Sequence, residues 1–138
     1  MTNHLEHFVK AQDGIFDEAI KEIEAGKKQS HWMWFVFPQL RGLGRSTTAF
    51  LYGIRTLDEA REYLAHPILG PRLEQATQCV LEAGVPPQNI FGEIDGQKFA
   101  SCMTLFGAAS SPKSLFNSAL RTITTIDKKT IQMLGEAE

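Results

Sequence analysis

Apolar residues recur every three or four positions along most of this chain, and this spacing constrains its fold more than any other feature. Such spacing places side chains on one face of an α-helix. Asp13-Gly14 interrupts the first stripe of this kind, and Gly26 follows its end. The sequence therefore predicts an amphipathic helix broken near residue 13, whose stripe is made by Leu5, Phe8, Val9, Gln12, Ile15, Phe16, Ala19, Ile20 and Ile23.

Residues that start and stop helices divide the middle of the chain. The hydroxyls of Ser46 and Thr47 suit a helix start. Thr56 and Glu59 match a capping box, in which both side chains bind free backbone N–H groups. These signals predict two short helices. Residues 67–84 begin with a proline and end with a glycine, which frames a longer helix.

The C-terminal third of the chain also contains residues that start helices, after a connecting segment. Residues 86–96, PPQNIFGEIDG, are rich in turn formers and predict a loop. Asp95 is the expected N-cap of the helix that follows, because apolar residues at helical spacing come directly after it. Ser111 before Pro112 is the expected start of another helix, and Asp127 can cap the last one.

Strand signals are confined to two short runs, residues 32–37 and 121–126. In the first run, Trp32 and Trp34 would share a face in a strand but diverge in a helix, so the type of this element stays open. The expected fold class is all-α. We predict a single compact domain over residues 1–138, with about six to eight short helices and one segment rich in aromatic residues and glycine.

The composition excludes several classes of partner. The chain has 138 residues, of which 43% are hydrophobic, and this is enough for one sizeable core. The net charge is −2 and both signs are mixed, so no overall field attracts nucleic acid or an anionic membrane. We expect neither as a partner, and any bound anion must be held by a local cluster.

The cysteines and the N-terminus indicate a cytoplasmic protein. Cys79 and Cys102 each lie in an apolar helical pattern and lack the short spacing of metal or redox sites, which favours two buried thiols in a reducing compartment. Residues 1–14 lack the basic start and apolar run of a signal peptide. No stretch approaches the roughly 18 apolar residues that a membrane-spanning helix needs.

Residues 41–47, RGLGRST, have the composition of an anion-binding turn. Two glycines permit unusual backbone angles just before a helix start, where free N–H groups carry partial positive charge. The alternative is a tight turn with a serine cap. The turn is not a Walker loop, because Arg45 replaces the lysine and Gln39 stands where a glycine is required. The candidate ligand-binding residues of this turn are Arg41, Gly42, Gly44, Arg45 and Ser46.

Aromatic residues immediately before this turn suggest a floor for a flat ring. Trp34 beside an anion-binding turn could hold a base and a phosphate together. The alternative is that both tryptophans belong to the core. Gln39 is a candidate specificity residue, because its amide offers a donor and an acceptor. His31 is a candidate acid or base.

A third group of candidates lies at the start of the helix near residue 95. Asp95, Lys98 and Ser101 are spaced three apart, which places them on one helix face. Lys98 could act as a base for a Ser101 nucleophile if it were desolvated. One alternative is an exposed ion pair on a capped helix, and another is that Asp95 anchors an arginine.

Metal and cofactor binding are not expected. His4 and His7 have helical spacing but lie at the chain end, and His66 has no partner at ligand spacing. We therefore predict no metal and no cofactor.

Three longer motifs resemble one known family. They are GKKQSHWMWFVFPQLRGLG at residues 26–44, YLAHPILGPRL at 63–73 and IFGEIDGQKFASCMTLF at 90–106, and with the stretches between them they span residues 26–106. They are similar to the domain-of-unknown-function family 1810. The resemblance implies a small, mostly helical bacterial domain. Some relatives carry the label calpastatin, but such inhibitor segments are disordered, whereas this chain has the periodicity of a packed domain. Relatives have Ser-Ser before MTLF, where this chain has Ser101-Cys102.

Three classes of function follow from these patterns. The first is a domain that binds, and could process, a small anionic ligand that is nucleotide-like or ADP-ribose-like. In that case we expect Trp34, Arg45 and Lys98 to converge on one cavity. The second is a protein–protein interaction module without catalytic activity, whose surface is residues 31–37 and whose tryptophans are exposed. The third is that these residues serve only as core and turn.

Overall fold

The chain folds into helices throughout the part that its structure, a computed structural model, describes, which is residues 5–137. This part contains no strand and ten helices, so the expectation of an all-α fold is confirmed while the expected number of helices is too low. The helices are α1 (Glu6–Gln12), α2 (Phe16–Glu24), α3 (Met33–Val36), α4 (Thr47–Leu51), α5 (Leu57–Ala65), α6 (Leu69–Ala83), α7 (Pro87–Phe91), α8 (Glu93–Ala108), α9 (Leu115–Thr122) and α10 (Lys128–Ala137).

Two short segments account for most of the difference between the expected and the observed number of helices. Residues 86–96, expected as a loop, contain α7 and the first turn of α8. Pro87 opens α7 because a proline at the first helical position loses no hydrogen bond. Residues 32–37, whose type was open, contain one helical turn, α3, so the two tryptophans diverge. Trp32 is buried, while Trp34 keeps part of its surface exposed.

Several helix ends lie where the sequence predicts them. The Ser46 hydroxyl accepts the N–H of Ala49 at 3.0 Å and caps α4. The Thr56 hydroxyl accepts the N–H of Glu59 at 3.0 Å and caps α5. At the end of α6, Gly84 has a φ of 68°, the left-handed conformation in which glycine commonly ends helices.

Two predicted caps are wrong. Asp95 does not cap α8, because that helix begins at Glu93, and the Asp95 carboxylate binds two lysines instead. Ser111 does not cap α9, because its hydroxyl accepts the N–H of Lys113 at 3.2 Å. The cap of α9 is Ser114, whose side chain accepts the N–H of Asn117.

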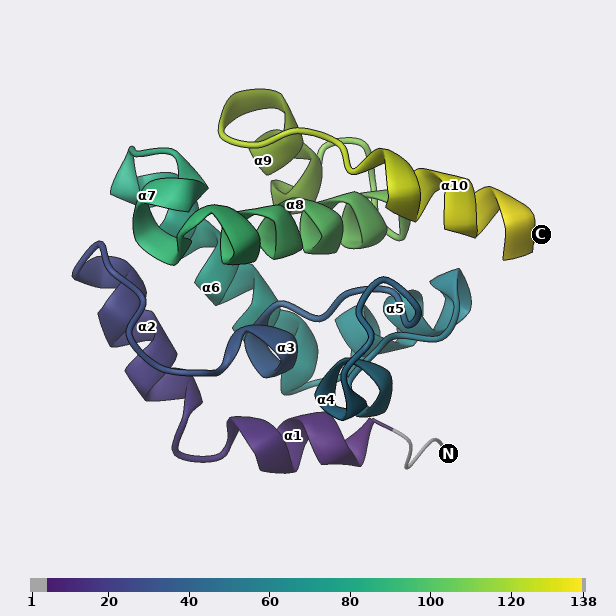
Figure 1. The fold of residues 1–138 in the computed structure, drawn as a ribbon, viewed down its shortest axis with the longest axis horizontal. Coiled ribbons are helices and arrows are strands. Elements are labelled where there is room, and N and C mark those ends of the chain that lie inside the picture. The colour runs from purple at the N-terminus through teal and green to yellow at the C-terminus, as the bar shows by residue number, and fades with distance from the viewer. Residues whose placement is uncertain (1–4, 138) are drawn as a thin grey trace.

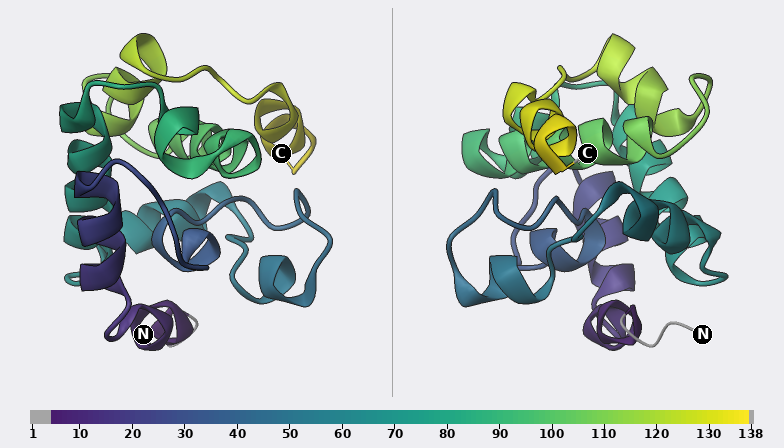
Figure 2. Two further views of the ribbon diagram at one scale, coloured as in Figure 1. Left: turned by 60° about the vertical axis from the view of Figure 1, so that its left-hand side comes forward. Right: turned by 90° about the vertical axis from the view of Figure 1, so that its right-hand side faces the viewer.

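The helices form two tiers joined along one side (Figures 1 and 2). Helices α7 to α10 make the upper tier, and α1, α3, α4 and α5 make the lower one. Helices α2 and α6 run between the tiers and pack against each other. The chain after α3 therefore faces the long helix α8 across the junction of the tiers.

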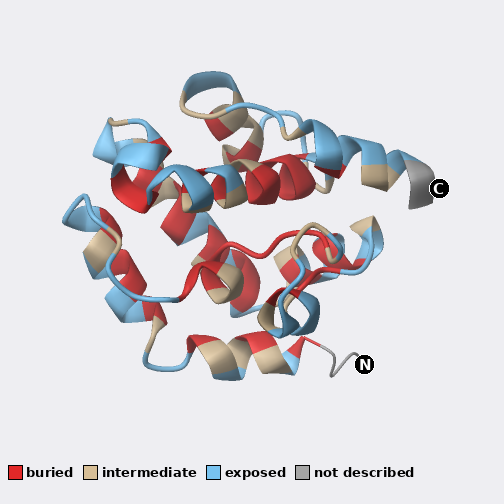
Figure 3. Cartoon of the chain, in the orientation of Figure 1, coloured by how far each residue is buried: buried red, intermediate tan, exposed pale blue. Residues whose placement is uncertain are grey.

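One hydrophobic core joins the tiers, and α8 contributes much of it (Figure 3). Residues 101–107 of α8 are buried on every side. Aromatic rings pack edge to face or tilted through this core; the Tyr63 ring lies 5.3 Å from both Phe8 and Phe106. The buried amide of Gln12 donates to the Tyr63 hydroxyl and to the Phe35 carbonyl, so the core also fixes the end of α3.

Candidate functional site

Five of the predicted site residues line a cavity of about 490 Å³ between the tiers. The lower tier contributes Trp34, Gln39, Leu43 and Gly44, and α8 contributes Ile94, Gln97, Lys98, Ala100 and Ser101. Thr125, Ile126, Asp127 and Lys129 complete the wall from the chain that enters α10. We call this the ring cavity, because the indole ring of Trp34 forms part of its wall.

Backbone hydrogen bonds fix Gln39 in the wall of the ring cavity. The Gln39 carbonyl accepts the N–H of Ile54 at 2.8 Å, and the Arg41 N–H donates to the Ile54 carbonyl at 2.7 Å. These bonds form an isolated parallel bridge. The Gln39 residue is only 3% exposed, and its amide nitrogen has no hydrogen-bond partner in the described structure. A buried donor without a partner costs about 1–3 kcal/mol.

The two glycines of the 41–47 turn have different structural roles: Gly42 allows an unusual backbone angle, and Gly44 allows close packing. Gly42 has a φ of 106°, which residues with a side chain rarely adopt. A Cβ on Gly44 would lie 2.7 Å from the outer edge of the Trp34 indole and equally close to Ala49. Gly44 therefore lets the turn press against Trp34 and sets where the indole lies.

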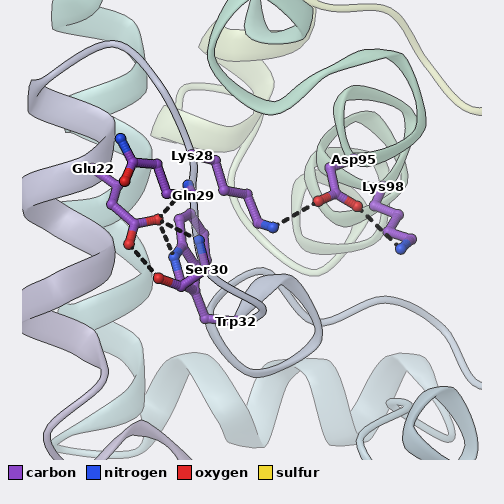
Figure 4. Close-up of polar contacts among 7 residues, drawn as sticks. All are labelled: Glu22, Lys28, Gln29, Ser30, Trp32, Asp95 and Lys98. Atoms are coloured by element: carbon purple, nitrogen blue, oxygen red, sulfur yellow. Dashed lines mark hydrogen bonds and ion pairs between the residues drawn. The ribbon is translucent and has the colours of Figure 1, made fainter.

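A charged triad stands beside Trp34. The two carboxylate oxygens of Asp95 bind the ammonium groups of Lys28 at 2.9 Å and Lys98 at 3.0 Å, from opposite sides (Figure 4). The Lys98 ammonium also lies 4.8 Å from the centre of the Trp34 ring, within the range of a cation–π contact. Burial by itself raises the pKa of Asp95, but the two lysines outweigh burial and hold that pKa below its usual value.

A second, smaller cavity of about 300 Å³ adjoins the ring cavity, since Trp34 and Lys98 line both. Its other polar residues are Lys28, His31, Ser46, Thr48 and Asp95. We call this the lysine cavity. Lys28 was not among the predicted site residues, because it lies in a polar loop and its partner Asp95 is far away along the chain.

The loop that carries Lys28 is tied to α2 by Glu22 (Figure 4). The Glu22 carboxylate accepts the backbone N–H groups of Gln29 and Ser30, the Ser30 hydroxyl and the indole N–H of Trp32, at 2.6–3.0 Å. Burial raises the pKa of Glu22, but these hydrogen bonds outweigh it and lower the pKa to about 2. Glu22 therefore holds the start of the aromatic segment in place.

The structure brings most, but not all, of the predicted site residues together. Trp34, Gln39, Gly44, Lys98 and Ser101 line the ring cavity, while His31, Trp34, Ser46, Asp95 and Lys98 line the lysine cavity. Three residues of the 41–47 turn, Arg41, Gly42 and Arg45, line neither.

The two arginines of the turn have other surroundings. The Arg41 Nε donates to the Phe50 carbonyl at 2.8 Å, and its guanidinium lies 4.1 Å from the centre of the Phe50 ring. Arg41 also lines a separate cavity of about 560 Å³ with Arg55, Arg61 and the last turns of α10, which we call the arginine cavity. Arg45 is exposed and has no hydrogen bond or ion pair with the described residues.

The serine and lysine of α8 do not bind each other. The Ser101 hydroxyl donates to the Gln97 carbonyl at 3.1 Å, within the helix. The ammonium of Lys98 binds Asp95. Asp95 also anchors no arginine, since Arg72 donates to Gln12 at 3.2 Å on another part of the molecule.

Of the histidines considered for metal binding, His7 and His66 line neither the ring cavity nor the lysine cavity. His4 lies outside the described residues, His7 stacks against Phe8 and Tyr52, and His66 accepts the N–H groups that open α6. Within residues 5–137, no three His, Cys, Asp or Glu side chains gather in a way that could hold a metal ion.

The remaining predictions concern the thiols and the membrane. Both cysteines are free; Cys102 is buried, and Cys79 is half-buried. Burial raises the pKa of the Cys102 thiol well above its ordinary value. Among the described helices, none combines the length and the apolar character needed to cross a membrane.

Two comparisons relate the chain to other proteins. The model of a family described as "Protein of unknown function (DUF1810)" matches residues 2–134. The crystal structure of the conserved hypothetical protein Rv1873 from Mycobacterium tuberculosis has a TM-score of 0.90 at 43% identity, and the match covers 95% of this chain and 96% of that one. No curated protein matches the chain.

Proposed function

Because the chain belongs to the DUF1810 family of proteins of unknown function, we propose its function from the geometry of the two cavities. The protein binds a small anionic ligand that carries a flat ring, such as a nucleotide or ADP-ribose. Trp34 and Lys98 stand at the centre of the site, since they line both cavities. We further propose that the protein is bacterial and cytoplasmic, and that the ligand is a metabolite of that compartment.

The observation that carries the proposal is the buried amide of Gln39. The amide nitrogen of its side chain has no partner, although Gln39 lines the ring cavity and its backbone carbonyl is held by the N–H of Ile54. Folding alone gains nothing from burying such a donor. Because the nitrogen itself is buried, the amide has to turn toward the cavity; a ligand acceptor there would then recover that cost and give the site specificity.

The rest of the ring cavity supports a flat, partly polar ring. Trp34 offers an aromatic surface, and Ile94 and Ile126 stand at the rim with 73% and 57% of their surface exposed. A bound ring would cover these apolar side chains, and each is too exposed to contribute much to the core. Lys98 would bring the anionic part of the ligand next to the ring.

The interaction-module alternative gains less support. It requires exposed tryptophans with no cavity behind them, whereas Trp32 is 1% exposed and Trp34 borders two cavities. Chemistry on the bound ligand stays part of the proposal as a second step, with His31, Lys98 and Ser101 as its candidate residues.

Titration of tryptophan fluorescence tests binding directly. Trp34 lies at both cavities, so AMP, ADP-ribose or NAD should change its emission, whereas a ligand bound elsewhere would not. The absence of any change at concentrations up to about a millimolar would contradict the proposal, because weaker binding is worth less than roughly 4 kcal/mol.

Replacing Gln39 with methionine should separate binding from stability. Met fills a similar volume and removes the unpartnered donor, so we expect the free energy of unfolding to rise by about 1 kcal/mol. Affinity for the best nucleotide should fall about tenfold, since the lost hydrogen bond is worth roughly 1.4 kcal/mol. Urea unfolding and fluorescence titration measure the two effects.

The matched control is Gln75→Met on the exposed face of α6, which should change neither quantity. If Gln39→Met instead destabilised the protein by more than about 1 kcal/mol and left affinity unchanged, Gln39 would be a structural residue and the proposal would lose its main support.

A further inference from the structure

The lysine cavity differs in chemistry from the ring cavity. Each cavity is lined by two lysines, one carboxylate and two hydroxyls, but the ring cavity adds two amides and two exposed isoleucines, Ile94 and Ile126. The lysine cavity adds an imidazole instead, and its two lysines bind its carboxylate directly. Neither Lys28 nor Thr48 stood out in the sequence. The two adjoining cavities therefore offer different partners to the two halves of one ligand.

Lys28 is the unusual residue of this cavity. Its side chain is only 10% exposed, although lysines are almost never buried to this degree unless they are paired. One of its three N–H donors binds Asp95, and its ammonium lies 5.3 Å from the centre of the Trp32 ring. Burial of this charge costs free energy that a single carboxylate offsets only in part.

Asp95 neutralises one of the two lysine charges, so the triad keeps one net positive charge beside the cavity. It also fixes both ammonium groups, because each lysine binds a different oxygen of the same carboxylate. Two ammonium groups held in place before a ligand arrives lose little side-chain freedom on binding.

We propose that the lysine cavity is the anion subsite of the ligand, in which Lys28 and Lys98 bind a phosphate group while the ring of the same molecule lies in the ring cavity. This inference rests on the proposed function and adds the position of the anion. The ligand class is a nucleoside phosphate, long enough to pass from one cavity to the other along Trp34. His31, Ser46 and Thr48 supply further donors to the phosphate oxygens.

The test is calorimetric titration of adenosine and AMP, which share the ring and differ in the phosphate. In the Lys28→Met variant, which keeps most of the apolar side chain but removes its charge, we expect affinity for AMP to fall about tenfold or more and affinity for adenosine to stay unchanged. Lys28→Arg should retain most of the affinity for AMP, because it keeps the charge.

The matched control is Lys27→Met, which removes the same charge from the exposed neighbouring residue and should leave both affinities unchanged. The inference is overturned if Lys28→Met lowers the affinity for neither ligand. It is also overturned if the variant keeps the thermal midpoint of the wild type and loses affinity for both ligands equally. Failure of the wild-type protein to bind either ligand is a different result, since it would overturn the proposed function itself. Binding of AMP that is unchanged by Lys28→Met would leave the ring cavity standing and remove only the anion subsite.

Discussion

Glu22→Ala is expected to lower the free energy of unfolding by about 3 kcal/mol, because four hydrogen bonds end on this one carboxylate. The substitution leaves the indole N–H of Trp32 without a partner, and Trp32 is only 1% exposed. It also frees the loop that carries Lys28. Urea unfolding at neutral pH measures the loss, and Glu18→Ala on the exposed face of the same helix is the matched control.

The contribution of Glu22 to the free energy of unfolding should decrease as the pH falls. Its pKa in the folded protein is about 2, below the ordinary value of 4.5, so the folded state favours the ionised form. The stabilisation is therefore complete above about pH 4.5 and is lost as the pH falls toward 2. The difference in stability between wild type and Glu22→Gln should shrink over this range. A difference that stayed constant from pH 6 to about 3 would contradict this role for the carboxylate.

Gly70→Ala is expected to cost about 3 kcal/mol for a steric reason. Gly70 lies in the first turn of α6, and a Cβ there would overlap the backbone carbonyl of Leu64 in α5. The obstacle is backbone rather than a flexible side chain, so α5 and α6 would have to separate. Both helices pack on the core, which makes this separation costly. Thermal unfolding of the variant measures the loss.

Gly135→Ala in α10 is the matched control for this substitution. No atom lies within 4 Å of a Cβ at Gly135, and alanine favours a helix by up to about 1 kcal/mol over glycine. We therefore expect it to leave stability unchanged or to raise it slightly. Equal effects of the two substitutions would mean that helix propensity alone, rather than the close crossing of α5 and α6, decides the outcome.

Local signals in the sequence predicted the helices well. The caps at Ser46 and Thr56 depend on hydrogen bonds between residues three apart, so a short stretch of sequence contains the whole interaction. The helix α7 was not predicted, because Pro86-Pro87 is equally typical of a turn. Packing against α8 decides between a turn and a helix at this place. Asp95 was misplaced as a cap for a similar reason, since its real partners are lysines and one of them, Lys28, lies far away in sequence.

The candidate site was predictable only in its residue types. Trp34, Gln39 and Lys98 stood out as unusual residues, and the structure places all three at the ring cavity. The sequence could not indicate that Arg41 would stack on Phe50 and face the arginine cavity instead. It also could not indicate Lys28, whose importance comes from burial and from contact with a distant carboxylate.

The most direct test of the central claim is a crystal structure of the protein with AMP bound. The account predicts the adenine ring in the ring cavity against Trp34, with one of its acceptors bonded to the amide nitrogen of Gln39. AMP in the arginine cavity, or no bound AMP at concentrations near a millimolar, would contradict it.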